Sequence, residues 1–306
     1  MSVKDHLRPL IHAVSTNPLT RGPLRGLAHA GILPPVVWNR LPVEETFTVT
    51  LPDGNSFRYA SIGHDLVGRA LYWGDIKPIL AGKKGQHHFE SETLSVYFKL
   101  AKQAQLVLDI GANTGLFAML ACAANPNARV LAFEPVPFVY ERTAGNIRIN
   151  GWEERCTVYN QAVSDRAGKA QFHVPTQQGL PASSSLNTEG FRGYKGTLIE
   201  VEVVTIDSVI PPGKKVDLAK IDVEGFEDKV LEGMRRVLAE SHPDLIIECL
   251  HDGPFRAVEA ILREYDYRFY HLNDTGIAPV EHIYAEETNP YRNFLCSTRP
   301  DITALS

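Results

Sequence analysis

Near-continuous apolar runs alternate with amphipathic segments from Gln105 to the end of the chain. The runs that we expect to be buried strands are QLVLDI, ARVLAFEP, CTVYNQAV, VDLAKIDV and PDLIIECL, followed by DYRFYHL and NFLCST. The segments with helical spacing are GLFAMLACAA, FVYERTAGNIRIN, GFEDKVLEGMRRVLAE and FRAVEAILREY. Strands that are apolar on both faces and alternate with helices are typical of a parallel sheet covered on both sides. The pattern therefore predicts an α/β fold with a doubly wound, mostly parallel sheet.

The chain before Ser91 has a different pattern. The segments FTVTL and SFRYA flank the turn sequence PDGN, which predicts a β-hairpin over residues 47–60. From Ser91, an expected helix N-cap, the apolar spacing predicts a helix that extends to Gln103. We therefore divide the chain into a small α+β extension, residues 1–90, and a main domain, residues 91–306.

A second hairpin is predicted inside the main domain by KAQFHV and IEVEVVTI. The 22-residue loop between them, from Pro175 to Gly196, is rich in Gly, Ser and Thr and is long enough to need a function. A lid over a binding site and a merely mobile insertion both fit this composition.

Composition and charge restrict the classes of function. The chain is 44% hydrophobic and 22% charged, which is ordinary for a soluble globular protein, and no apolar run is long enough to cross a bilayer. The first residues lack the apolar core of a secretory signal, and the net charge of -5 disfavours nucleic acid as a partner. Four scattered cysteines without a CxxC pair indicate small buried residues. We expect a cytoplasmic protein with no membrane span; a homo-oligomer stays open.

The stretch LVLDIGANTGL, residues 106–116, joins the first buried strand to a helix. In a doubly wound sheet this bend holds the ligand. A dinucleotide fingerprint needs G-x-G-x-x-G, but Asn113 and Leu116 occupy two of the glycine places, and no Gly-Lys-Ser/Thr follows for a P-loop. The remaining pattern is D-x-G-x-N-x-G, whose glycines let a ligand approach the backbone closely. Its first residue, Asp109, can face a cationic group of the ligand.

A second acid ends the next expected strand. Glu134 follows Gly115 by 19 residues. A carboxylate at the end of the second strand can accept hydrogen bonds from both hydroxyls of a ribose, as it does in NAD sites. A nucleoside with an ammonium group and no phosphate satisfies both signals, which indicates S-adenosylmethionine. We assign its methionine half to the bend, its ribose to Glu134 and its adenine to the end of the third strand. The expected cofactor-binding residues are Asp109, Gly111, Ala112, Asn113, Gly115, Glu134, Pro135, Gln161 and Ala162.

Several segments together carry a resemblance: LVLDIGANTG, VLAFEP, YNQAVSD, SSSL, VEVVTIDS, LAKIDVEGFEDKVLEGM and PDLIIE. In these the chain resembles the FkbM family of S-adenosylmethionine-dependent methyltransferases, most distinctively in KIDVEG, residues 220–225. The resemblance implies a class I methyltransferase fold whose seven-stranded sheet ends in an antiparallel strand. It also implies methyl transfer to oxygen on a small-molecule or glycan acceptor. The first ninety residues, which match poorly, would then serve substrate choice.

In the methyltransferase layout the tips of the fourth and fifth strands lie beside the methyl group. Asp222 ends the fourth strand and Glu224 opens the next helix, where the helix dipole alone also explains an acid. Glu248 ends the fifth strand, and His251 is a candidate general base. Glu248 could orient His251 or could instead hold a substrate hydroxyl. These four are the expected catalytic residues. Because their spacing shows no definite ligand set, we predict no metal.

Two alternatives to a methyltransferase stay open. An NAD-linked oxidoreductase on a similar sheet predicts binding of NADH, although the broken glycine pattern disfavours it. A non-catalytic module that kept the pocket predicts cofactor binding without turnover.

Overall fold

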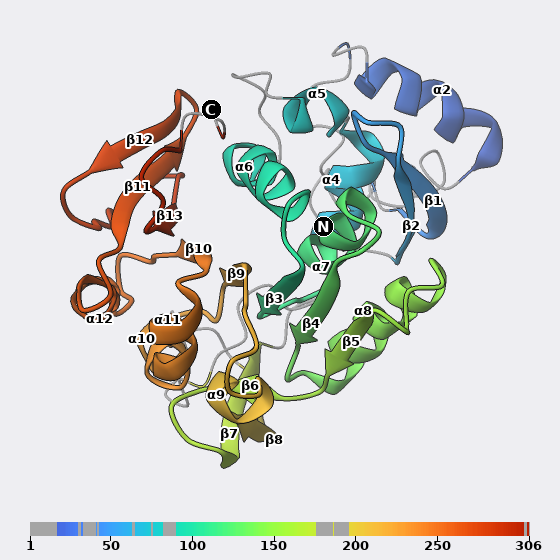
Figure 1. Cartoon of the computed structure of the whole chain (residues 1–306). Coiled ribbons are helices and arrows are strands. Elements are labelled where there is room, and N and C mark those ends of the chain that lie inside the picture. Colours follow the sequence, from blue (N-terminus) through green and yellow to red (C-terminus); the bar gives the residue numbers. More distant parts are fainter. Residues whose placement is uncertain are drawn as a thin grey trace.

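A computed structural model of the chain describes residues 17–29, 32, 41, 43–62, 65–74, 76–81, 90–175, 186, 196–302 and 305. Its centre is an eight-stranded sheet with the order β12-β11-β13-β10-β9-β3-β4-β5 (Figure 1). The strands of this sheet are β3 (Leu106–Ile110), β4 (Arg129–Phe133), β5 (Cys156–Tyr159), β9 (Leu218–Ile221), β10 (Asp244–Glu248), β11 (Arg268–Asn273), β12 (Gly276–Val280) and β13 (Asn293–Ser297).

The sheet is parallel in its middle and antiparallel at one side. Strands β5, β4, β3, β9 and β10 are parallel neighbours, whereas β13 enters antiparallel between β10 and β11. This arrangement confirms the predicted sheet and its antiparallel ending, and β12 adds an eighth strand as the hairpin partner of β11. The chain order reverses between β3 and β9, so the carboxyl ends of these strands flank the switch point where α/β sheets bind ligands.

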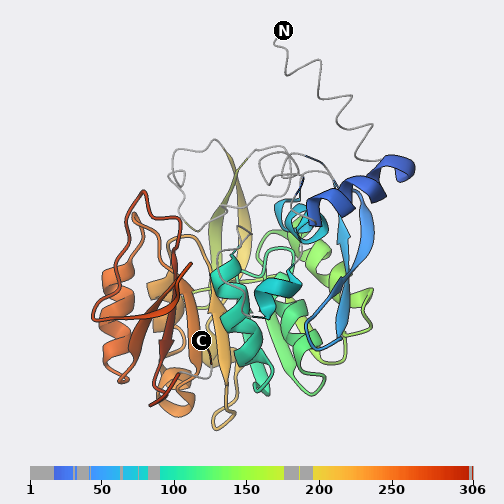
Figure 2. The ribbon, with the colours of Figure 1, turned by 90° about the horizontal axis from the view of Figure 1, so that it is seen from above.

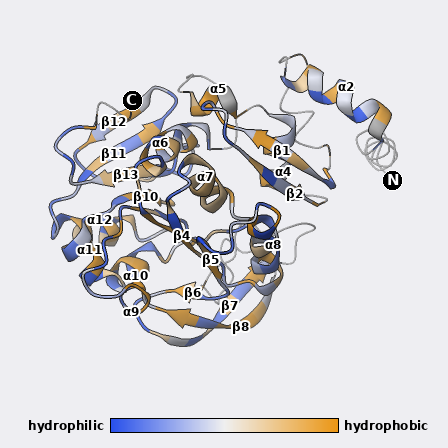
Figure 3. Cartoon of the chain, turned by 45° about the vertical axis from the view of Figure 1, so that its right-hand side comes forward, coloured by the Kyte–Doolittle hydropathy of each residue, from blue (hydrophilic) through white to orange (hydrophobic). Residues whose placement is uncertain are grey.

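Helices cover both faces of the sheet (Figure 2). Against one face pack α6 (Ser91–Ala101) and α7 (Leu116–Ala124), while α8 (Pro137–Arg148) lies beside β5. The helices of the opposite layer are α9 (Ile206–Val209), α10 (Glu227–Glu232), α11 (Arg235–Ser241) and α12 (Phe255–Arg263). All nine residues of α7 are apolar and buried (Figure 3). A helix that is apolar all round must be covered on every side, and α7 lies between the sheet and the N-terminal hairpin.

The N-terminal hairpin is confirmed: β1 (Glu45–Thr50) pairs antiparallel with β2 (Ser56–Ser61). It packs near α2 (Pro18–His29), α4 (Leu66–Trp73) and α5 (Lys77–Leu80). The hydroxyl of Tyr59 lies 2.7 Å from Oγ1 of Thr114, and the Ala60 N–H donates to the Asn146 side chain at 2.9 Å. The hairpin is therefore attached to the bend that follows β3.

The second predicted hairpin, β7 (Gly168–Pro175) with β8 (Gly196–Val204), is also confirmed. The loop between its strands lies outside the described residues, apart from Leu186. The prediction of one strand over CTVYNQAV was wrong, because the chain leaves the main sheet after β5 and forms β6 (Ala162–Val163) beside β8. The Asn160 side chain fixes this corner by donating to the carbonyls of Glu134 and Pro135, both at 2.9 Å.

Two further predictions needed correction. The expected helix GFEDKVLEGMRRVLAE is divided into α10 and α11, because the Asp207 carboxylate accepts the N–H groups of Arg236 and Val237 and starts a new helix. At the start of α6 the N-cap is Glu90, with φ +46°, and not Ser91, whose hydroxyl binds the neighbouring Glu92. The four cysteines are buried and free, as predicted.

Candidate active site

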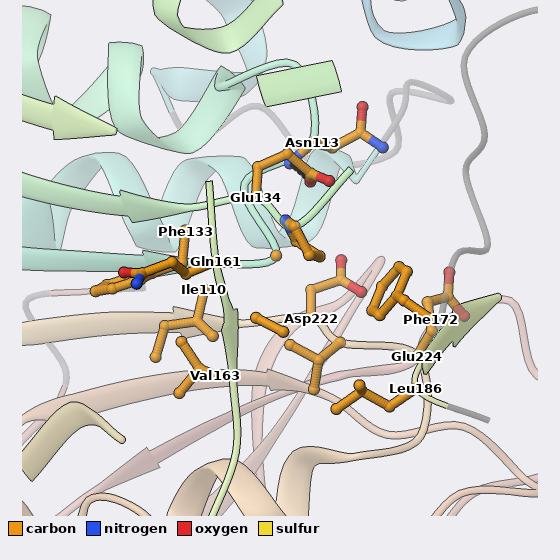
Figure 4. Close-up of a pocket in the computed structure, with 14 residues that line it drawn as sticks. Ile110, Asn113, Phe133, Glu134, Gln161, Val163, Phe172, Leu186, Asp222 and Glu224 are labelled. Carbon is orange, nitrogen blue, oxygen red and sulfur yellow. Dashed lines mark hydrogen bonds between the residues drawn. The ribbon is translucent and has the colours of Figure 1, made fainter. Parts of the chain in front are cut away.

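A pocket opens at the carboxyl ends of β3, β4 and β9, at the switch point of the sheet (Figure 4). It holds about 660 Å³ of empty space, part of which is open solvent. The residues that line it are Ile110, Gly111, Asn113, Phe133, Glu134, Pro135, Gln161, Ala162, Val163, Phe172, Leu186, Asp222, Val223 and Glu224.

The glycine bend forms one wall of the pocket. Gly111 has φ +84°, and a β-carbon there would lie 1.8 Å from the carbonyl oxygen of Asp222, so only glycine lets the bend lie this close to the end of β9. Asn113 also adopts the left-handed region, with φ +48°, and its carbonyl accepts a hydrogen bond from the Thr143 hydroxyl. The bend is therefore rigidly shaped before any ligand binds.

Glu134 joins the bend to the end of β4. Its Oε2 accepts the Asn113 N–H at 3.0 Å and its Oε1 accepts the Val136 N–H at 2.9 Å. Burial raises the pKa of Glu134 to about 8, although the two backbone donors lower it. Figure 4 shows Glu134 beside Asn113 at the pocket. Backbone donors thus orient this carboxylate, and each oxygen keeps a lone pair for a ligand hydroxyl.

The corner after β5 supplies a mostly apolar wall. Gln161 and Ala162 line the pocket as expected, together with Val163. The strand β7 adds Phe172 from the second sheet, which the sequence analysis did not identify. Its signal was present in the alternation of KAQFHV, but nothing in that pattern shows which sheet the strand would cover.

Acidic side chains gather at the ends of β9 and β10. Asp222 and Glu224 line the pocket, and single carboxylate oxygens of Asp222, Glu224 and Glu248 lie within 4.8 Å of one another. Burial raises the pKa of Glu248 well above its usual range, and the charges of Asp222 and Glu224 raise it further, whereas Lys220 lowers it. Three of the four expected catalytic residues are therefore neighbours.

Lys220 is a site residue that the sequence analysis missed. Its side chain is 1% exposed, and Nζ donates to Asp222 Oδ2 at 3.3 Å. Burial lowers the pKa of Lys220, but the charges of Asp222, Glu90 and Glu248 outweigh it and the net shift is upward. The signal for Lys220 was a lysine inside an otherwise apolar strand, which is costly without an acidic partner.

Some expected residues lie outside the pocket lining. Asp109 is buried, and its Oδ2 accepts the Ala118 N–H at 2.8 Å, so it caps the first turn of α7. Ala112 and Gly115 belong to the bend without lining the pocket. His251 also lies outside the lining; its Nδ1 is 3.8 Å from Oδ1 of Asp252, with the side chain 36% exposed.

The strand order, with a pocket between a glycine bend and an acid at the end of the next strand, defines a class I methyltransferase fold. A family model described as the methyltransferase FkbM domain matches residues 109–269, just over half of the chain. The chain belongs to the FkbM family of methyltransferases, as the resemblance implied.

Several named proteins are similar to this chain. The 2-O-methyltransferase NoeI of Sinorhizobium fredii is 28% identical over 186 residues, which are 55% of this chain and 74% of the relative. The 31-O-demethyl-FK506 methyltransferase FkbM of Streptomyces tacrolimicus is 28% identical over 214 residues, 59% of this chain and 79% of the relative. A crystal structure of methyltransferase FkbM from Methylobacillus flagellatus superposes with a TM-score of 0.41 at 19% identity, over 63% of this chain and 43% of the other.

Among the described residues, helices that combine the length and the apolar character needed to cross a bilayer are absent.

Proposed function

We propose that the protein is an S-adenosylmethionine-dependent O-methyltransferase whose acceptor is a hydroxyl group of a sugar, a glycan or another hydroxylated small molecule. The observation that carries this proposal is the Glu134 carboxylate, held at the pocket by two backbone N–H groups beside a bend that only glycine can form. A carboxylate fixed in this way fits the two hydroxyls of a ribose.

The pocket residues fit the cofactor part by part. Glu134 would hold the ribose, and the backbone from Gly111 to Asn113 would contact the methionine half. Gln161 and Ala162, with the apolar side chains beside them, would enclose the adenine. Asp109 is not among the groups that line the pocket, so we assign it to the support of the bend through its hydrogen bond to Ala118.

The bound cofactor would supply an activated methyl group, so the protein has to align the acceptor and take its proton. Asp222 and Glu224 line the pocket and Glu248 lies next to them. We propose that this acidic group orients the hydroxyl and accepts its proton. His251 is the second candidate base.

Oxygen as the methylated atom is supported by the names of two relatives, a 2-O-methyltransferase and a 31-O-demethyl-FK506 methyltransferase. We further propose that residues 1–90, which lie outside the family match, contribute to the choice of acceptor.

A screen of hydroxylated acceptors tests this function. The purified chain is incubated with S-adenosylmethionine and a panel of sugars, glycans and hydroxylated metabolites, and products are detected by the mass increase of one methyl group. We expect methylation of at least one hydroxyl compound, and its loss in Asp222→Ala. Cofactor binding without turnover on any acceptor would favour the non-catalytic module, and reduction of NAD would favour the oxidoreductase.

A further inference from the structure

The acidic group beside the pocket has the dimensions of a cation site. Asp222 and Glu224 follow β9, and Glu248 ends β10, the parallel neighbour of β9. One oxygen from each carboxylate lies within 4.8 Å of the other two. Oxygen ligands lie about 2.3–2.6 Å from Ca²⁺ and about 2.0–2.1 Å from Mg²⁺, so three oxygens can share one ion when they lie within about 5.2 Å of one another for Ca²⁺ and within about 4.2 Å for Mg²⁺.

Within the described part of the chain, Lys220 contacts this acidic group through a hydrogen bond from its Nζ to Asp222 Oδ2 at 3.3 Å. Glu90 adds a further acid whose charge acts on the pKa of Lys220, and the buried Oε2 of Glu90 has no hydrogen-bond partner within the described part of the chain. Carboxylates held this close together repel one another when ionised, and either a proton shared between two of them or a further cation relieves that repulsion.

A second observation, independent of the acids, also indicates an ion. Asn293 on β13 is the direct antiparallel partner of Glu248, so the two side chains lie next to each other on one face of the sheet. The Asn293 residue is 4% exposed, and its Oδ1 has no hydrogen-bond partner among the described residues. A buried amide oxygen without a donor is costly, and amide oxygens are ordinary ligands of hard divalent cations.

We propose that Asp222, Glu224 and Glu248, together with Oδ1 of Asn293, form a binding site for a divalent cation of the Mg²⁺ or Mn²⁺ type. All of these ligand atoms are oxygens, which favours hard cations over zinc. Since the spacing of these residues along the chain indicated no ligand set, the site depends on the meeting of β9, β10 and β13.

The ion would lie at the pocket wall, because Asp222 and Glu224 line the pocket. Its role toward the acceptor rests on the proposed function: a coordinated hydroxyl loses its proton more readily than a free one. The substrate class is thereby narrowed to acceptors with an oxygen that can reach the ion.

Manganese binding to the full chain, stripped of metal, tests the site directly. Free Mn²⁺ is followed by electron paramagnetic resonance during a titration. We expect one ion per chain, displaced by Mg²⁺, and at least tenfold weaker binding in Glu248→Gln and in Glu224→Gln. Asn293→Ala should also weaken binding. The matched control is Glu281→Gln, a glutamate whose side chain is 88% exposed, which should bind Mn²⁺ like the wild type.

The proposal is overturned if the wild type shows no saturable Mn²⁺ binding. It is also overturned if Glu248→Gln and Glu224→Gln both bind Mn²⁺ as tightly as the wild type does. Circular dichroism checks the fold of every variant, and Glu224→Gln carries the test if Glu248→Gln does not fold. S-adenosylhomocysteine binding to the same samples separates this proposal from the proposed function. In the wild type, absence of Mn²⁺ binding with intact S-adenosylhomocysteine binding contradicts only the metal site, whereas Mn²⁺ binding without S-adenosylhomocysteine binding contradicts only the cofactor assignment.

Discussion

At position 111 two constraints coincide: φ is +84°, and a β-carbon would lie 1.8 Å from the Asp222 carbonyl oxygen. Gly151 has φ +68° with no atom within 4 Å of an added β-carbon, so it shares only the first constraint. We expect Gly151→Ala to cost about 1–2 kcal/mol from backbone strain. Gly111→Ala should cost more and abolish S-adenosylhomocysteine binding, as measured by urea unfolding and calorimetry. Equal losses in the two variants would show that the close approach is unimportant.

Glu134→Gln tests the assigned ribose contact. The amide keeps the volume of the carboxylate but brings an NH₂ group against one of the backbone donors, Asn113 or Val136, and loses charge-assisted acceptance. We expect S-adenosylhomocysteine to bind at least about tenfold more weakly, equivalent to about 1.4 kcal/mol. Glu153→Gln, at an exposed glutamate, is the control. Unchanged calorimetric affinity would place the ribose elsewhere.

The pH dependence of stability follows from the same carboxyl group. Burial raises the pKa of Glu134 to about 8 and that of Asp109 to about 7, so the folded protein keeps protons that the unfolded chain has already lost. The stability that these retained protons add to the folded protein is fully present below the ordinary pKa range of carboxyl groups, and it is lost as pH rises to about 8. The free energy of unfolding, measured with a chemical denaturant, should therefore fall less steeply with rising pH in Glu134→Gln than in the wild type. The two slopes should differ by at most about 1.4 kcal/mol per pH unit between about pH 5 and 8. Parallel curves would contradict the raised pKa.

At the scale of elements, the N-terminal hairpin and the start of α4 contact the glycine bend through one buried tyrosine. The Tyr59 hydroxyl lies 2.9 Å from Asp65 Oδ2 and 2.7 Å from Thr114 Oγ1, and Asp65 also accepts the Gly68 N–H at the start of α4. Tyr59→Phe leaves Asp65 and Thr114 without this partner, which should cost about 1–3 kcal/mol in urea unfolding. The control is Tyr140→Phe, at a less buried tyrosine of α8. A wild-type midpoint in Tyr59→Phe would show that the contact does not hold the hairpin.

Helices and strands could be predicted where the pattern of apolar residues along the chain is local. They could not be predicted where contacts with distant residues end an element early. Both hairpins and the parallel strands followed from alternation and apolar runs. The corner at Asn160 depends on carbonyls of Glu134 and Pro135, more than twenty residues earlier, and the break before α11 depends on Asp207. No window of adjacent residues contains those contacts, so the sequence pattern continued the strand and the helix too far.

For the whole molecule, topology explains which site residues were found. Parallel strands end at one edge of the sheet, so Gly111, Glu134 and Asp222 could be placed together once the strands were known, and family resemblance supplied the chemistry. Phe172 comes from a separate sheet, whose packing onto the pocket the sequence does not show. Asp109 was expected to face the ligand, but its side chain projects to the face of the sheet that α7 covers and accepts the Ala118 N–H there.

We infer that the switch point of this sheet binds an aminoacyl nucleoside and not a dinucleotide. Isothermal titration calorimetry of the purified full chain with S-adenosylhomocysteine and, separately, with NADH distinguishes the two ligands. We predict saturable binding of one S-adenosylhomocysteine per chain and no measurable heat from NADH. Saturable binding of NADH, with none of S-adenosylhomocysteine, would contradict it.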